Sequence, residues 1–192
     1  MNRILFIRHG STAGNLERRY IGRTDEPLCL QGVAQIKKLA ETKLNADVLF
    51  VSPARRTKET AEILFPGMPG TEVPGLWETN FGRFEGKTAD ELWETEESYR
   101  QWVDGNCLGA VPEGESVAQF KDRCCEAFLQ CMTQVPDGAA VAFVIHGGCI
   151  MGILERFALP KRDFYDYHIS NGAYLTCTME NGSLTLQEPV SG

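Results

Sequence analysis

Residues 3–15 read RILFIRHGSTAGN and join a short apolar run to a basic turn. The run 3–7 is rich in β-branched and aromatic residues, which is typical of a strand buried on both faces of a parallel sheet. Arg8 and His9 follow at the carboxyl end of this strand, where open α/β sheets bind their ligands, so they indicate an anion site. On these letters alone a surface Arg-His pair beside a turn glycine is the preferred interpretation, because short motifs often match by chance.

Two later apolar runs end in the same way. Residues 47–51 (DVLFV) lead into Ser52-Pro53, and residues 139–145 (AAVAFVI) lead into His146-Gly147-Gly148. If the three strands are parallel, their carboxyl ends meet at one edge of the sheet, and the backbone N–H groups of the following turns point inward. The basic residues gathered at this edge would be Arg8, His9, Arg56 and His146. Two guanidiniums and two imidazoles form a receptor for a tetrahedral dianion such as phosphate, so a shared pocket becomes the preferred interpretation.

Helical patterns alternate with these strands. Ser52-Pro53 has a capping hydroxyl and an N1 proline, Thr88 and Ser116 open capping boxes, and Asn181-Gly182 between two apolar runs predicts a hairpin. The predicted helices are 30–44, 53 to about 64, 88–93, 98–103, 116–134 and 149–157, the hairpin strands are 173–179 and 184–187, and residues 14–27 are expected to form a loop over the site. We therefore expect an α/β fold, a three-layer α/β/α sandwich with a mostly parallel central sheet and an antiparallel C-terminal edge, in a single domain over residues 1–192.

The composition restricts the class of protein. The chain has 192 residues, 43% of them hydrophobic, and a formal net charge of −7. This charge argues against the broad basic surface that binding to nucleic acid or to an anionic membrane requires, so an anion site must be a local pocket. No apolar run approaches the ~20 residues of a membrane span, and the first strand begins too close to Met1 to leave room for a signal peptide. We expect a cytoplasmic protein.

The cysteines and histidines do not indicate a metal site. The seven cysteines are odd in number and include no CxxC pair, so we expect small apolar core residues of a reduced protein. Guanidinium groups beside the histidines would repel a cation, so no metal is expected in the pocket. A Ser-His-Asp site has little support, because the chain contains no GxSxG nucleophile elbow.

Basic residues at the start of the second predicted helix break a local rule. Arg55, Arg56 and Lys58 oppose the helix dipole there, at a cost of about 0.3–1 kcal/mol each near the surface. We expect Arg55 and Lys58 to be solvated and to pair with Glu59 and Glu62. Arg56 is the exception, because violations of this kind are expected at functional sites.

Four stretches carry the candidate site in one order along the chain. They are RHGSTAGN at 8–15, SPARRTKETA at 52–61, LWETNFGRFEG at 76–86 and VIHGG at 144–148. Together they resemble the motifs of the histidine phosphatase superfamily, in its phosphoglycerate-mutase-like branch. The chain departs from the family pattern at Ala54, Thr57, Glu59 and Phe84. These positions flank the catalytic ones, so the departures bear on specificity more than on activity.

The resemblance implies a role for each residue of the predicted pocket. His9 would attack phosphorus as a neutral imidazole and form a phosphohistidine. Glu78 would protonate the leaving alkoxide and later take a proton from water. The other implied site residues are His146 as the second catalytic histidine and Arg8, Asn15, Arg56 and Gly147 as phosphate-binding residues. Neither a metal nor another cofactor is implied.

The activity that the resemblance favours is a phosphatase acting on a small phosphorylated metabolite. Mutases of the family carry a longer insertion between the acid and the second histidine and a C-terminal tail over the site, whereas here the segment from Glu78 to His146 is short and the chain stops soon after the predicted hairpin. YIGRTDEPLCLQG at 20–32 and EGES at 113–116 most resemble α-ribazole phosphatases of cobalamin synthesis. A phosphoglycerate mutase, a fructose bisphosphatase-like or broad-specificity sugar phosphatase, and a non-catalytic phosphate-binding protein are the alternatives.

The sequence leaves the surroundings of the pocket open. His168 stands outside any motif, and we expect it to cap the last strand rather than to lie at the pocket mouth. Tyr20, Arg23 and Trp77 are candidate substrate contacts that no pattern decides. We expect a monomer or a homodimer, with no nucleic-acid or membrane partner.

Overall fold

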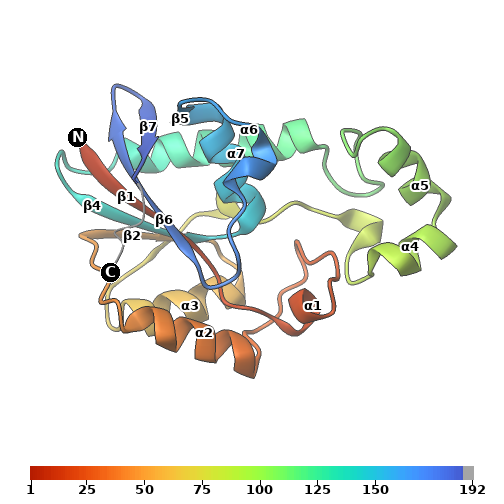
Figure 1. Cartoon of the computed structure of the whole chain (residues 1–192), viewed down its shortest axis with the longest axis horizontal. Coiled ribbons are helices and arrows are strands. Elements are labelled where there is room, and N and C mark those ends of the chain that lie inside the picture. The colour runs from red at the N-terminus through yellow and green to blue at the C-terminus, as the bar shows by residue number, and fades with distance from the viewer. Residues whose placement is uncertain (188–192) are drawn as a thin grey trace.

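A seven-stranded sheet within residues 1–187 organises the chain (Figure 1). The computed structural model describes these residues, and residues 188–192 of the predicted domain lie outside the described part. The strand order is β3-β2-β4-β1-β6-β7-β5. The strands are β1 (Asn2–Arg8), β2 (Val48–Val51), β3 (Thr71–Glu72), β4 (Ala140–Ile145), β5 (Ala158–Leu159), β6 (Tyr174–Glu180) and β7 (Ser183–Leu186).

The three strands that end in polar turns are parallel neighbours. β4 lies between β1 and β2, and Phe143 of β4 stands opposite Phe6 on one side and Phe50 on the other. The carboxyl ends of these strands therefore meet at one edge of the sheet, as the sequence predicts. This edge carries the turns that begin at His9, Ser52 and His146.

The C-terminal hairpin is antiparallel, as predicted. β6 pairs antiparallel with both β1 and β7. Asn181 and Gly182 have φ angles of 50° and 78°, which the two-residue turn of a tight hairpin requires and which these two residue types adopt most readily. The short strand β5 pairs in parallel with β7 and extends the sheet beyond the hairpin.

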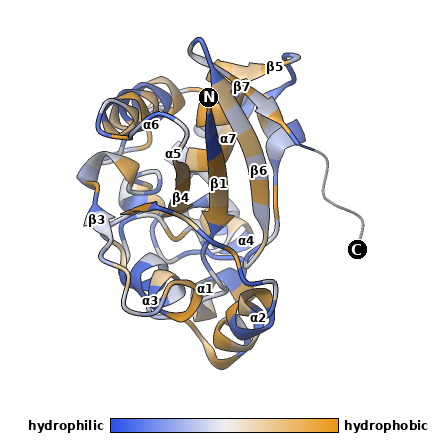
Figure 2. Cartoon of the chain, turned by 90° about the vertical axis from the view of Figure 1, so that its left-hand side faces the viewer, coloured by the Kyte–Doolittle hydropathy of each residue, from blue (hydrophilic) through white to orange (hydrophobic). Residues whose placement is uncertain are grey.

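Helices cover both faces of the sheet. The first layer holds α2 (Leu30–Ala40) and α3 (Arg55–Leu64), and the second holds α6 (Val117–Met132) and α7 (Gly147–Phe157). Side chains of β1 alternate between the layers, because Leu5 and Ile7 pack with the first and Ile4 and Phe6 with the second. Figure 2 shows β1 and β4 coloured as hydrophobic between the two layers. The predicted three-layer α/β/α sandwich is confirmed.

Two short helices, α4 (Ala89–Thr95) and α5 (Glu97–Asp104), lie beyond the carboxyl edge of the sheet (Figure 1). They pack on an aromatic cluster that is separate from the two sheet cores. Its buried members are Phe84, Leu92, Tyr99 and Val111, and Tyr20, Phe81, Trp102 and Val103 pack against them. The hydroxyls of Tyr20 and Tyr99 are 2.9 Å apart, which connects α5 to the loop after β1. We call α4, α5 and the loop 105–114 the cap.

α2 ends at Ala40 rather than at residue 44, and three elements at the carboxyl edge of the sheet also differ from the prediction. α7 begins at Gly147 rather than at Cys149, so His146 takes the N-cap position. α1 (Ala13–Leu16) forms where a loop is expected, because Thr12 and Asn15 make a capping box. α3 begins at Arg55 and has no side-chain cap, so the prediction that the Ser52 hydroxyl caps this helix is wrong.

The cysteines are free thiols, as predicted. Five of them are buried: Cys124, Cys125, Cys131, Cys149 and Cys177. Burial raises the pKa of the Cys125 and Cys131 thiols to about 11. Such thiols stay protonated and act as small apolar groups of the core.

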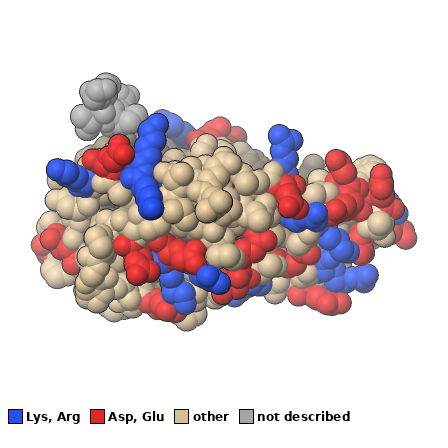
Figure 3. Space-filling view, turned by 90° about the horizontal axis from the view of Figure 1, so that it is seen from below, with Lys and Arg blue, Asp and Glu red and all other residues tan. Residues whose placement is uncertain are grey.

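Charged side chains of both signs are interspersed on the face seen in Figure 3. Arg55 is exposed and pairs with Glu59 at 2.7 Å, as predicted. Lys58 instead pairs with Glu72 of β3 at 3.4 Å, because β3 brings that carboxylate beside the helix. Within residues 1–187 no helix combines the length and the apolar character that crossing a membrane requires.

Candidate active site

The carboxyl edge of the sheet brings the four predicted basic residues together. The rings of His9 and His146 meet edge to face with centroids 5.2 Å apart. A Cβ atom on Gly147 would lie 3.2 Å from Cζ of Arg8, so this guanidinium lies against the first turn of α7. Arg56 is fully buried and its charge acts on both histidines. The three turns therefore form one site.

His9 is held in one orientation and as a neutral base. Its side chain is nearly buried, and Nδ1 lies 2.7 Å from the carbonyl oxygen of Gly10. Burial, reinforced by the positive charges of Arg56 and Arg8, lowers the pKa of His9 to about 3. A neutral imidazole whose Nδ1–H donates to a carbonyl keeps its lone pair on Nε2. His9 therefore has the protonation state and the tautomer of a nucleophile.

Arg8 is fixed by the segment before the C-terminal hairpin. Its Nη1 donates to the carbonyl oxygen of Ile169 at 2.7 Å and lies 3.3 Å from Nε2 of His168. The expectation that His168 caps the last strand is wrong, because β6 begins only at Tyr174 and His168 lines the cavity of the site. The short helix η3 (Phe164–Tyr167) turns the chain back toward Arg8, and the sequence around an isolated histidine does not reveal this turn.

Arg56 fixes a loop of the site. Its Nη2 and Nη1 donate to the carbonyl oxygens of Gly22 and Thr24, at 2.8 and 2.9 Å. The Glu85 carboxylate accepts amide N–H groups of the same loop, from Gly22 at 3.1 Å and from Arg23 at 2.7 Å. A buried guanidinium needs partners of this kind. The loop is therefore held between a buried cation and an anion, and the prediction that Arg56 differs from its solvated neighbours is confirmed.

His146 contacts Ser52 across the ends of β4 and β2. The Ser52 hydroxyl lies 2.7 Å from Nε2 of His146, and both side chains are fully buried. Trp77 stacks on the imidazole with ring planes 8° apart and centroids 6.4 Å apart. Burial, with a further contribution from Arg56, lowers the pKa of His146 well below its usual value. The second histidine is therefore also neutral, and the Ser52 hydroxyl binds it instead of capping α3.

Three buried nitrogen atoms of the site have no hydrogen-bond partner within residues 1–187. They are Nε of Arg8, Nε of Arg56 and Nδ1 of His146. Leaving a buried polar group unpaired costs about 1–3 kcal/mol, and such groups are rare in native proteins. Three of them on residues of one site indicate a ligand that accepts several hydrogen bonds, as a tetrahedral oxyanion does.

Glu78 reaches the site from the segment after η1 (Pro74–Leu76). One carboxylate oxygen accepts the amide N–H of Gly148 at 3.0 Å, and the other accepts that of Thr79 at 2.9 Å. Gly148 lies in the first turn of α7, where the helix dipole favours a negative charge. A Cβ atom at position 148 would clash with the carboxylate, so this contact needs glycine. The predicted acid thus stands against the same helix turn as Arg8.

Arg123 and Glu115, to which the sequence analysis assigns no role, support the segment that carries the acid. Nη1 of Arg123 donates to the carbonyl oxygens of Gly75 and Trp77 at 2.9 and 3.0 Å, and Nη2 donates to that of Glu78 at 3.3 Å. Glu115 accepts Nε and Nη2 of Arg123 in a bidentate ion pair, at 3.2 and 2.6 Å. In the sequence, only the EGES motif points to Glu115, and the motif does not show which segment this glutamate contacts.

Asn15 and Gly147, the two further phosphate-binding candidates, both line the cavity. Oδ1 of Asn15 accepts the N–H of Thr12 and Nδ2 of Asn171, both at 3.2 Å. Because its oxygen is engaged, the Nδ2 group of Asn15 is the part that can serve an anion. Gly147 is the first residue of α7, so its amide belongs to the positive end of the helix dipole.

The site opens into a cavity of about 640 Å³. Arg8, Asn15, Glu78 and Gly147 belong to its lining. His9, Arg56 and His146 are the more deeply buried part of the site, with exposed fractions of 4%, 0% and 0%. A cavity of this volume is within the range of about 300–1,000 Å³ that holds small-molecule ligands.

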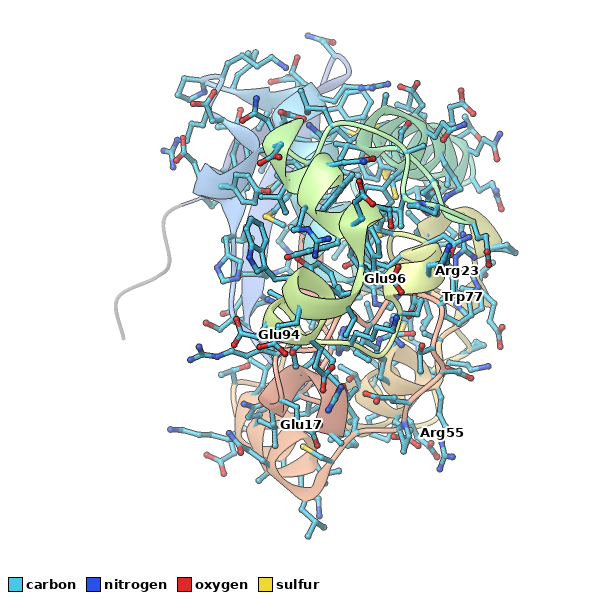
Figure 4. The ribbon with its side chains drawn as sticks, turned by 90° about the vertical axis from the view of Figure 1, so that its right-hand side faces the viewer. Glu17, Arg23, Arg55, Trp77, Glu94 and Glu96 are labelled. Carbon is cyan, nitrogen blue, oxygen red and sulfur yellow. The ribbon has the colours of Figure 1, made fainter. Side chains whose placement is uncertain are left out.

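Tyr20, Arg23 and Trp77, whose contacts the sequence leaves open, have different positions. Tyr20 lines the cavity, whereas Arg23 and Trp77 lie beside each other outside its lining (Figure 4). Cζ of Arg23 is 5.5 Å from the centre of the Trp77 ring, a cation–π contact that joins the loop after β1 to the acid segment.

Comparison with known sequences gives a family match over most of the chain. Residues 4–190 match the family model described as Histidine phosphatase superfamily (branch 1). The chain is 34% identical over 163 residues to the Escherichia fergusonii protein named "Probable phosphoglycerate mutase GpmB", covering 80% of this chain and 75% of that protein. A Serratia proteamaculans protein of the same name is 35% identical over 160 residues, covering 79% and 74%.

Solved structures share the fold. The α-ribazole phosphatase of Shigella flexneri superposes with a TM-score of 0.88 at 22% identity, over 96% of this chain and 94% of that one. The phosphoserine phosphatase of Entamoeba histolytica, solved in complex with 3-phosphoglyceric acid, gives a TM-score of 0.82 at 25% identity, over 98% and 96%. The first likeness, at 22% identity, shows the fold alone. The relatives carry the names of two activities, phosphatase and mutase.

Proposed function

Because the chain belongs to the histidine phosphatase superfamily, we propose that it is a metal-independent phosphatase which hydrolyses a small phosphomonoester through a phosphohistidine on His9. One observation carries this proposal. Arg8, Arg56 and His146 each have a buried nitrogen without a partner, the His146 ring lies against that of His9, and both arginine charges act on the neutral His9. The site therefore offers hydrogen bonds and positive charge to an oxyanion beside an unprotonated nucleophile.

The first step is an in-line displacement at phosphorus. The lone pair on Nε2 of His9 forms the N–P bond while the bond from phosphorus to the ester oxygen breaks. Arg8 and Arg56 stabilise the charge on the equatorial phosphoryl oxygens. Because both guanidiniums are already held in place, the site does not have to reorganise during the reaction. A protonated Glu78 gives its proton to the departing alkoxide, which leaves as an alcohol.

The second step returns the enzyme to its starting state. Water attacks the phosphorus of phosphohistidine, and the Glu78 carboxylate takes its proton. The N–P bond breaks, its electrons return to Nε2 of His9, and inorganic phosphate leaves. The hydrogen bonds that Gly148 and Thr79 donate hold the Glu78 side chain in place.

The leading candidate substrate is α-ribazole 5′-phosphate, an intermediate of cobalamin synthesis. Residues 20–32 and 113–116 resemble the corresponding segments of α-ribazole phosphatases, and Glu115 of the second segment supports the acid segment through Arg123. The names of the sequence relatives favour a second candidate, phosphoglycerate mutase. A broad-specificity sugar phosphatase and a non-catalytic phosphate-binding protein are weaker alternatives.

The proposal extends to the setting in which the enzyme works. We propose a cytoplasmic monomer or homodimer whose partner is a small phosphorylated metabolite, without nucleic acid or membrane. The net charge of −7 supports the absence of nucleic-acid and membrane partners, because it confines anion binding to a local pocket.

A screen of phosphorylated metabolites tests the proposal. The kcat/KM values of α-ribazole 5′-phosphate, 3-phosphoglycerate and several sugar phosphates are compared in the presence of EDTA. We expect release of inorganic phosphate, with α-ribazole 5′-phosphate preferred. Preference for phosphoglycerates with transfer to a second acceptor would instead identify a mutase, and the absence of turnover on every ester would leave only a binding protein.

A further inference from the structure

We infer that the cavity takes a phosphomonoester with a flat, apolar body and a single anionic group, and that it excludes substrates with a second anion such as a carboxylate. This inference rests on the proposed function, because it concerns the part of the substrate that extends from the phosphate. It divides the candidate substrates by charge, since phosphoglycerates carry a carboxylate next to the phosphate.

The cationic side chains of the cavity lining are Arg8, Arg19 and Lys121. Arg19 is paired with Glu17 at 2.6 Å and with Glu91 at 2.9 Å. Within residues 1–187, Arg8 is the one of the three that makes no salt bridge. One end of the cavity therefore offers a cation to an anion, and this end is the predicted phosphate site.

Glu155 stands about two turns of α7 beyond Gly147, against which Arg8 lies, and its part of the lining carries negative charge. Lys121, on α6, is engaged with Glu155 of α7, with Nζ 2.6 Å from the carboxylate, and it also lies 4.5 Å from the centre of the Phe164 ring. Asp163 adds a further carboxylate to the lining. A second anion in this part of the cavity would lose its hydration and meet these acids without a free cation, which is unfavourable.

The rest of the lining is largely apolar, with aromatic and aliphatic side chains beside the polar Thr79, Asn106 and Glu115. The first apolar group is Tyr20 from the loop after β1, Phe81 from the segment that follows Glu78, and Trp102 from the cap. The second group, from α6, α7 and η3, is Phe120, Met151 and Phe164. Tyr20 and Phe81 meet at 5.0 Å between ring centroids, and Tyr20 and Trp102 at 6.3 Å. Aromatic walls of this kind favour a flat body through stacking and the burial of apolar surface. A cavity of about 640 Å³ has room for such a body.

Three esters with primary alkoxide leaving groups separate the two parts of the inference. They are ethyl phosphate, benzyl phosphate and 4-(phosphonooxymethyl)benzoate. We expect kcat/KM for benzyl phosphate to exceed that for ethyl phosphate about tenfold or more, and the added carboxylate to remove about tenfold again. Equal values for ethyl and benzyl phosphate, or no loss with the carboxylate, would overturn the inference.

Two variants and one control connect the effects to named residues. Phe164→Ala should reduce the preference for benzyl over ethyl phosphate, whereas Tyr174→Ala, at an exposed position of β6 outside the lining, should not. Glu155→Gln frees the Lys121 ammonium and should raise kcat/KM for the carboxylated ester relative to benzyl phosphate. A general loss of structure would lower kcat/KM for both esters. An unchanged ratio in a variant that keeps its kcat/KM for benzyl phosphate would contradict the charge argument.

A binding measurement distinguishes failure of this inference from failure of the proposed function. The non-hydrolysable analogues are propylphosphonate, 2-phenylethylphosphonate and 4-(2-phosphonoethyl)benzoate, and their Kd values are measured by calorimetry. The same order of affinity without hydrolysis of any ester would support the cavity inference and reject the phosphatase. Hydrolysis with equal Kd values for the first two analogues would reject the inference and keep the phosphatase.

Discussion

The Ser52 hydroxyl and Nε2 of His146 are 2.7 Å apart in a fully buried contact between the ends of two strands. When Ser52 donates, Nε2 is the acceptor and the proton of the neutral ring stands on Nδ1, which has no other partner within residues 1–187. His9 is held the opposite way, because its Nδ1 faces the Gly10 carbonyl. With Ser52 as the donor, the site presents a lone pair on Nε2 of His9 and a proton on Nδ1 of His146.

Ser52→Ala should lower activity through His146. Without the hydroxyl, Nε2 can carry the proton and Nδ1 no longer donates to the phosphoryl group, so we expect kcat/KM for p-nitrophenyl phosphate to fall about tenfold. The lost buried hydrogen bond should lower the free energy of unfolding by about 1 kcal/mol. Ser98→Ala is the matched control, because the Ser98 hydroxyl is buried without a partner. Full activity in Ser52→Ala would show that the serine does not set the state of His146.

His9→Ala should abolish both turnover and the covalent intermediate. Rapid alkaline quenching with labelled substrate should trap a phosphoenzyme in the native protein and none in this variant, because the lone pair on Nε2 is lost. Turnover of p-nitrophenyl phosphate in EDTA should fall to background. His168→Ala should still form the phosphoenzyme, since its Nε2 contacts Arg8 rather than the reacting phosphorus. Trapped phosphoenzyme in His9→Ala would exclude His9 as the nucleophile.

The burial of neutral His9 should appear in the dependence of stability on pH. Its pKa is about 3 in the folded protein and about 6.5 in the unfolded chain, so between these values the unfolded state binds the additional proton. Stability contributed by this group is therefore present above pH 6.5 and falls by about 1.4 kcal/mol per pH unit as the pH drops toward 3. Urea unfolding between pH 6 and 4 should give a shallower slope for His9→Gln. An identical slope would mean that His9 is protonated in the folded protein.

Glu78→Gln should affect esters according to their leaving groups. An alkoxide needs a proton to depart and nitrophenolate does not, so the loss of kcat/KM should be about 100-fold or more for an alkyl phosphate and much smaller for p-nitrophenyl phosphate. The amide keeps an acceptor oxygen for one of the N–H groups of Gly148 and Thr79, which limits the structural change. An equal loss for both substrates would count against an acid role.

The sequence predicts the fold and the basic residues of the site because both depend on local pattern. Three apolar runs that end in turns predict the parallel strands β1, β2 and β4, and parallel strands bring their carboxyl ends together. The same logic identifies His9, Arg8, Arg56 and His146 as neighbours. Arg56 is distinguished from Arg55 by the resemblance, and only Arg56 is buried.

The residues that the sequence misses act through contacts between distant segments. Ser52 fits a helix cap equally well, and only the pairing of β2 with β4 brings its hydroxyl to His146. The position of His168 depends on the turn made by η3, which leaves no periodic signal. Glu115 acts on the acid segment through Arg123, which follows it by eight residues. No sequence motif predicts this contact.

Arg123→Lys should weaken the acid step while the phosphate site stays intact. One ammonium cannot replace a guanidinium that binds the carbonyl oxygens of Gly75, Trp77 and Glu78 and a carboxylate at once. The segment of Glu78 should lose its fixed position, so kcat for alkyl phosphates should fall about tenfold with little change in KM, and p-nitrophenyl phosphate should be affected less.

Glu115→Gln should give the same pattern as Arg123→Lys in milder form, because the amide keeps one acceptor for the Arg123 guanidinium but loses the ion pair. Arg156→Lys is the matched control, since Arg156 forms a comparable pair with Asp122 at 2.6 Å on the surface, away from the acid segment. Steady-state kinetics on an alkyl and an aryl ester, with thermal unfolding of each variant, separate positioning from stability. If both esters lose kcat equally while the melting temperature falls, the pair supports only the fold, because a general loss of folded protein does not distinguish leaving groups.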